Sequence, residues 1–73
     1  MADTFTVVLR GYDRAQVDAA IGRADAALSS GSETMRASAR ADLAGQAFDR
    51  VLRGYDTREV DRALTELLGG LGP

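Results

Sequence analysis

The stretch Leu9-Arg10-Gly11-Tyr12-Asp13 occurs a second time, unchanged, as Leu52-Arg53-Gly54-Tyr55-Asp56. A shift of 43 residues also aligns the flanking sequence, so that positions 5–21 share ten identities in seventeen with positions 48–64. Composition alone does not explain an unbroken five-residue match. The sequence therefore predicts one small domain over 1–73, built of two repeats (5–28 and 48–71) that are joined by a loop and a middle helix.

Each copy of the stretch ends in a signal for the start of a helix. Asp13 is followed three residues later by Gln16, and Asp56 by Glu59, which is the spacing of a capping box. In that motif the aspartate accepts an early backbone N–H, and the Gln or Glu side chain reaches back to the N–H of the cap itself. We therefore expect Asp13 and Asp56 to be helix caps.

The glycine two residues before each cap predicts a sharp turn into the helix. Gly11 and Gly54 can adopt positive φ without the steric cost that a side chain adds. The arginine before each glycine, Arg10 or Arg53, would then lie at the tip of the turn.

An apolar stripe of helical period follows each cap. Its residues recur at spacings of four, three and four, which predicts two short helices that pair along these faces. The stripe of the first repeat is Val17, Ile21, Ala24 and Leu28, and that of the second is Val60, Leu64, Leu67 and Leu71.

The predicted fold class is mainly α, with a short extended N-terminal arm. Alternating β-branched residues over Thr4–Leu9 favour the extended arm, and Ser29-Ser30-Gly31-Ser32 has the composition of a loop. The segment 48–52 lacks such alternation, which leaves open that it continues the preceding helix. The three expected helices span about 14–28, 33–47 and 57–69.

Composition excludes several function classes. The chain has 73 residues, no Cys and no His, so disulfides, thiolate zinc sites and histidine-based catalysis are excluded. A net charge of −2 disfavours nucleic acid as a partner. No metal cluster, cofactor motif, signal sequence or membrane-spanning run is recognisable, so we expect a non-enzymatic, cytoplasmic protein without cofactor.

The repeated motif, Phe-x-x-x-Leu-Arg-Gly-Tyr-Asp-x-x-x-Val-Asp, resembles the N-terminal motif of the DivIVA family of bacterial cell-pole and septum proteins. The two copies, at 5–21 and 48–64, together cover about half of the chain. Within the family, the chain resembles the DivIVA-domain repeat proteins of high-GC Gram-positive bacteria. Its composition fits such a source, because all nine basic residues are Arg.

The resemblance implies a role in positioning at the inner face of the membrane during cell division or polar growth. In the family, an apolar residue and the Arg after it lie on an exposed loop that touches anionic membrane, the Gly and Tyr shape that loop, and the Asp caps the helix. Carried over, the membrane-binding residues are Leu9, Arg10, Leu52 and Arg53. The loop-shaping residues are Gly11, Gly54, Tyr12 and Tyr55.

The chain departs from the family pattern in two respects. Leu stands where the best-known members have Phe before the Arg, and the long parallel coiled coil of the family is absent from this sequence. We therefore interpret the two repeats as the counterparts of the two chains of a family dimer, folded into a single-chain pseudo-dimer. Because so short an Ala-rich chain has a marginal core, we also expect a homo-oligomer, formed through the helix at 57–69 or the middle helix.

Three alternatives remain at the level of sequence. Leu9 and Leu52 could belong to the core, as we expect of Phe5 and Phe48. The chain could be a soluble protein–protein adaptor that co-assembles with a larger coiled-coil partner without binding lipid. A compact DNA-binding domain is disfavoured because acidic residues dilute its arginines. Exposure of both Leu-Arg pairs on one face would favour the membrane over the adaptor.

Overall fold

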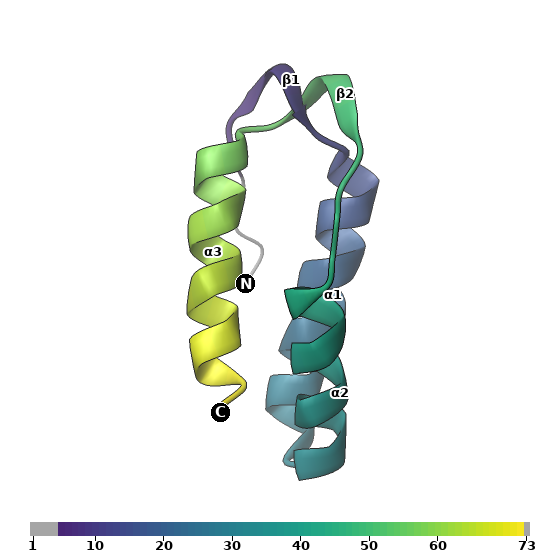
Figure 1. Cartoon of the computed structure of the whole chain (residues 1–73), viewed down its shortest axis with the longest axis vertical. Coiled ribbons are helices and arrows are strands. Elements are labelled where there is room, and N and C mark those ends of the chain that lie inside the picture. Colours follow the sequence, from purple (N-terminus) through teal and green to yellow (C-terminus); the bar gives the residue numbers. More distant parts are fainter. Residues whose placement is uncertain (1–4, 73) are drawn as a thin grey trace.

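The computed structural model describes residues 5–72, which form three helices and a two-stranded sheet (Figure 1). The mainly helical class and the number of helices are thus as predicted for the described part of the chain. Thr4, the first residue of the predicted arm, lies outside it. The elements are β1 (Val7–Tyr12), α1 (Arg14–Ser30), α2 (Glu33–Ala44), β2 (Arg50–Tyr55) and α3 (Thr57–Gly70).

The two strands cross at one end of the molecule, and the helices extend from that end. Figure 1 shows α1 and α3 running in the same direction away from the crossing, while α2 returns beside α1. Each strand begins near one column of helices and leads into the other, so β1 ends in α1 and β2 ends in α3. The described residues therefore form an elongated body with the sheet at one tip.

The sheet is antiparallel in register, since Val7 faces Tyr55 at one end and Tyr12 faces Arg50 at the other. Each strand also bends into an arch, as Figure 1 shows, and the pairing is irregular along its whole length. At the feet of the arches Tyr12 pairs with Tyr55 as well. Leu9-Arg10 and Leu52-Arg53 are the central residues of the two strands, and we call these four residues the apex.

A second strand was not predicted, and this part of the sequence-based fold is wrong. The segment 48–52 does not continue α2, which ends at Ala44 rather than near residue 47. Gly45 caps α2 with its backbone N–H, and residues 50–55 then pair with β1. The segment 48–52 has no strand-like alternation of its own. Its last residues form a strand because they pair with β1 of the other repeat, which is a long-range influence on strand formation.

The loop at 29–32 is shorter than predicted, because α1 continues to Ser30. The Ser30 hydroxyl donates a hydrogen bond to the Ala27 carbonyl at 2.7 Å, which accommodates serine in the last turn. Gly31 then ends the helix with φ 73°, as glycine commonly does in left-handed caps.

The core consists of two clusters. The one beneath the arches holds Phe5, Val17 and Val60, and the two valines are fully buried. The other cluster lies farther along the helices, and its buried residues are Ala20, Ala24, Ala27, Leu43 and Leu71.

The two predicted apolar stripes are only partly buried. Val17, Ala24 and Val60 are buried, Ile21, Leu64 and Leu67 are half-buried, Leu28 is exposed, and Leu71 is buried beyond the end of α3. On α1 the buried positions include Ala20 and Ala27, because this helix packs against α2 as well as α3. On α2, Leu43 is buried but Met35 is exposed.

Glycine is required where the arches cross, although not for the reason that the sequence suggested. Positive φ occurs among residues 5–72 at Arg10, Gly31 and Gly72, and not at Gly11 or Gly54. A Cβ on Gly11 would instead overlap the carbonyl carbon of Gly54, and one on Gly54 would overlap the Tyr12 carbonyl oxygen. The two backbones thus approach too closely for any side chain between them.

Replacing Gly11 with Ala should therefore destabilise the fold by about 3 kcal/mol or more, because the added methyl group overlaps backbone that cannot easily shift. The matched control is Gly22→Ala. Gly22 lies in α1 with open space around it, and this change should stabilise the chain by about 0.5–1 kcal/mol. Urea unfolding followed by circular dichroism measures both, and equal midpoints for the two variants would refute the crossing.

Candidate membrane-contacting apex

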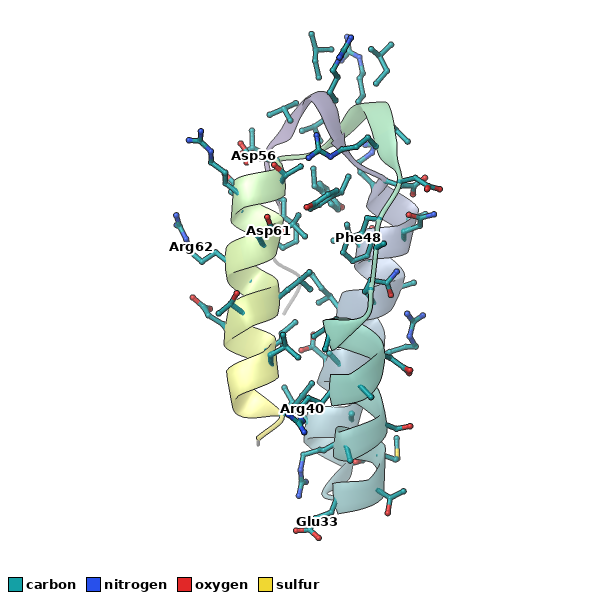
Figure 2. All side chains as sticks on the ribbon, viewed as in Figure 1. Glu33, Arg40, Phe48, Asp56, Asp61 and Arg62 are labelled. Atoms are coloured by element: carbon teal, nitrogen blue, oxygen red, sulfur yellow. The ribbon has the colours of Figure 1, made fainter. Side chains whose placement is uncertain are left out.

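The four residues of the apex are all exposed at the same end of the molecule. Leu9 is 68% exposed and Leu52 is 71% exposed, and both arginines are exposed as well. Leu9 faces Arg53 across the two strands, so the two Leu-Arg pairs lie side by side, and we call each pair a tip of the apex. Figure 2 shows side chains projecting beyond the ribbon here. Leu9 and Leu52 are thus surface residues and not part of the core.

The strands that carry the apex differ in charge from the rest of the chain. β1 reads VVLRGY and β2 reads RVLRGY, so together they hold three of the nine basic residues and none of the eleven acidic ones. Val7, which is 43% exposed, adds to the apolar surface. Exposed aliphatic side chains beside arginines suit contact with an anionic interface, where the apolar part inserts and the guanidinium stays at the surface.

The two tips are not equivalent in backbone conformation. Arg10 adopts φ 62°, whereas Arg53 has no positive φ. Left-handed backbone costs a residue with a side chain roughly 1–2 kcal/mol, so the packing around the arches must hold Arg10 in place.

Each tyrosine at the foot of an arch bonds to the helix that follows the other arch. The Tyr12 hydroxyl donates to Asp61 Oδ1 at 3.0 Å, and the Tyr55 hydroxyl donates to Asp18 Oδ1 at 2.9 Å. Aromatic rings also pack against each other across the repeats in tilted pairs, with centroids 5.2 Å apart for Phe5–Tyr55 and 5.3 Å for Tyr12–Phe48. The tyrosines therefore fix the arches to the helices.

These tyrosine–aspartate bonds were not predicted from the sequence. A signal was present, because Tyr and Asp recur at the same spacing in both repeats. The rings of Tyr12 and Tyr55 are half-buried, so they belong to the core only in part.

Asp13 and Asp56 cap their helices as predicted. Gln16 and Glu59, three positions after the caps, have another role than the capping box predicts. Asp13 accepts from the Gln16 N–H, and Asp56 accepts from the N–H groups of Arg58 and Glu59. The Gln16 side chain does not return to the cap. It bonds the Asp49 backbone N–H at 2.8 Å and the Asp49 carboxylate at 3.0 Å.

Glu59 acts in the same way on the first repeat. Its carboxylate accepts from the Thr6 N–H at 2.8 Å and from the Thr6 hydroxyl at 2.9 Å. The N–H groups of the caps are bonded by backbone instead, since Asp13 donates to the Asp49 carbonyl and Asp56 to the Thr6 carbonyl. Each helix start therefore holds the chain that enters the opposite arch.

Comparison of the chain with family models, with curated proteins and with solved structures finds no significant match. Over the described residues, none of the helices combines the length and the apolar character needed to cross a bilayer. The functional interpretation accordingly depends on the apex and on the motif.

The tyrosine bonds should make stability depend on alkaline pH. Burial raises the pKa of both tyrosines above the ordinary value of 10.0, and the hydrogen bond to the aspartate raises it further. The stabilisation is therefore complete below pH 10 and is lost as pH rises through the higher pKa of the folded state.

The double substitution Tyr12→Phe/Tyr55→Phe keeps the rings but removes both hydroxyls. At about pH 8, the loss of each bond should lower the free energy of unfolding by about 1 kcal/mol. Between about pH 8 and about pH 11, the variant should lose less further stability than wild type, because it has no tyrosine to ionise at these two positions. Urea unfolding at the two pH values tests this, and parallel losses in both proteins would contradict it.

The strain at Arg10 predicts opposite effects of one substitution at the two tips. Arg10→Gly should raise the free energy of unfolding by about 1 kcal/mol, because glycine tolerates positive φ. Arg53→Gly should lower it by about 0.5–1 kcal/mol, because it only adds freedom to the unfolded chain. Thermal and urea unfolding measure the difference, and a shift of the same sign in both variants would show that the tips are equivalent.

Proposed function

We propose that this chain is a non-enzymatic, DivIVA-like module that binds anionic membrane through its apex. In this proposal it acts at the inner face of the membrane in bacterial cell division or polar growth. The observation that carries it is the exposure of Leu9, Arg10, Leu52 and Arg53 together at one end. These are also the residues that the resemblance assigns to membrane contact.

The contacts between the repeats support the comparison with a family dimer. Under the shift of 43 residues, the Tyr12–Asp61 bond corresponds to Tyr55–Asp18, and the Phe5–Tyr55 ring pair corresponds to Tyr12–Phe48. The strand bounds and the starts of α1 and α3 correspond as well. A single-chain pseudo-dimer is the arrangement that such exchanged contacts favour.

The expected affinity of the apex follows from its parts. A leucine fully buried in the bilayer interface contributes about 1.5–3 kcal/mol, and an arginine near an anionic surface contributes about 1 kcal/mol. One tip alone therefore binds weakly. Two tips held rigidly at one end engage together, which raises affinity through effective concentration.

The direction of the helices is compatible with this mode of binding. α1 and α3 both leave the crossing on the side away from the apex. With the apex in the interface, the helical part of the molecule would extend from the membrane and remain available to partners.

Co-sedimentation with anionic and neutral vesicles tests the proposal. Wild type should bind anionic vesicles preferentially, and both Leu9→Ala/Arg10→Ala and Leu52→Ala/Arg53→Ala should reduce binding about tenfold or more, as expected from the loss of one tip. Leu28→Ala/Arg40→Ala is the matched control, because it removes the same side-chain types from exposed positions on the helices. It should leave binding unchanged.

Circular dichroism establishes that each variant is folded. A folded wild type that does not bind anionic vesicles would refute membrane contact and favour the soluble adaptor, which co-assembles with a larger coiled-coil protein. Equal binding by wild type and both apex variants would show that another surface is responsible.

A further inference from the structure

Two hydrogen-bonded contacts that hold the arches are not the same in the two halves of the molecule. Under the shift of 43 residues, Thr6 corresponds to Asp49, and Gln16 corresponds to Glu59. The Glu59 carboxylate accepts from the Thr6 hydroxyl at 2.9 Å, whereas the Gln16 amide donates to the Asp49 carboxylate at 3.0 Å. Donor and acceptor have thus changed sides between the repeats. We call the Thr6–Glu59 and Gln16–Asp49 contacts the entry pairs.

The other polar and aromatic contacts between the repeats use the same residue types in both halves. Each tyrosine hydroxyl bonds an aspartate of the other repeat, and each tyrosine ring packs on a phenylalanine of the other repeat. On the strands, Val7 faces Tyr55 and Arg50 lies over the Tyr12 ring, and either side chain can pack on a tyrosine. These contacts would form between any two repeats, so the entry pairs decide which repeats fit each other.

Two second repeats would not satisfy the entry pairs. Glu59 of each would face Asp49 of the other, because the contacts between the repeats are reciprocal. An ionised carboxylate accepts hydrogen bonds and donates none, so each side-chain bond would be replaced by repulsion between like charges. Glu59 is half-buried, which limits the screening of that repulsion by solvent and salt.

Two first repeats would satisfy the entry pairs. Gln16 of each would face Thr6 of the other, and both side chains are neutral. The amide oxygen of Gln16 could accept the backbone N–H, as it does from Asp49, and the amide nitrogen could donate to the hydroxyl. The selection is therefore one-sided, and it acts on the second repeat.

We propose that the entry pairs make the crossing selective, so that the second repeat accepts a first repeat and rejects a copy of itself. The partner that fits the second repeat carries a neutral hydroxyl donor in place of Asp49 and a neutral amide in place of Glu59. This goes beyond the proposed function, because it concerns recognition between repeats and requires no membrane. The same rule would prevent separate chains from joining through their second repeats.

Substitutions in the full chain reproduce each kind of pairing. Thr6→Asp/Gln16→Glu gives the first repeat the residues of the second, and its melting temperature should fall by about 10 °C or more as like charges replace two bonds. Asp49→Thr/Glu59→Gln gives the second repeat the residues of the first, and it should melt within about 4 °C of wild type. Thermal unfolding followed by circular dichroism at neutral pH and low salt measures both.

The fourfold exchange combines these substitutions and moves each entry pair to the opposite arch. It should melt within about 4 °C of wild type, although it contains both destabilising changes. A fourfold exchange as unstable as Thr6→Asp/Gln16→Glu would overturn the proposal, because the positions would then simply not tolerate new side chains. Equal melting temperatures for the two double variants would overturn it as well.

The matched control is Thr34→Asp/Gln46→Glu, which makes the same two residue changes away from the arches. Thr34 is an exposed residue of α2, and Gln46 lies near Arg23, so the melting temperature should change by less than about 4 °C. A loss like that of Thr6→Asp/Gln16→Glu would show that net charge is responsible and would overturn the proposal.

Salt separates repulsion from steric misfit. Raising the ionic strength to about 1 M shortens the screening length to about 3 Å. The difference in melting temperature between Thr6→Asp/Gln16→Glu and wild type, compared at equal salt, should therefore become smaller. A difference that is unchanged by salt would refute selection by charge.

Discussion

The close approach of Gly11 and Gly54 is the constraint on which the rest of the structure depends. Because the two backbones cross without intervening side chains, each strand can leave one column of helices and enter the other. The crossing brings the tyrosine of each repeat to the helix of the other repeat, where its hydroxyl donates a hydrogen bond to an aspartate. It also bends the strands so that the Leu-Arg pairs lie outermost. A wider separation would remove both the anchoring and the exposed apex.

The stability of the sheet end comes mainly from contacts between the repeats. Gln16 and Glu59 each bond the backbone of the segment that enters the opposite arch, and the aromatic pairs also join one repeat to the other. The helices farther along have a core rich in alanine, which buries little area per residue. The chain thus combines a sheet end that many contacts join with helices whose shared core is rich in alanine.

Local features of the sequence predicted the helices but not the sheet. Asp13 and Asp56 identified both helix starts, because capping depends on residues within one turn. β2 could not be found in this way, since 48–52 has no strand pattern of its own and β2 pairs with residues 38 to 48 positions earlier in the chain. The apex was suggested by the repeated motif, yet only the fold brings its two halves together. The roles of Asp18 and Asp61 were missed for the same reason, as each bonds a tyrosine of the other repeat.

The exchange of contacts between the repeats has a consequence for how the chain folds. The partners of Thr6, Tyr12 and Gln16 lie 53, 49 and 33 residues further along. Such long-range contacts slow folding relative to a simple helical bundle, and the first repeat cannot complete its arch until the second has been synthesised. In the meantime its unpaired strand matches the second repeat of any neighbouring molecule as well as its own. A high local concentration of chains would therefore favour domain-swapped molecules, in which the crossing forms between two chains.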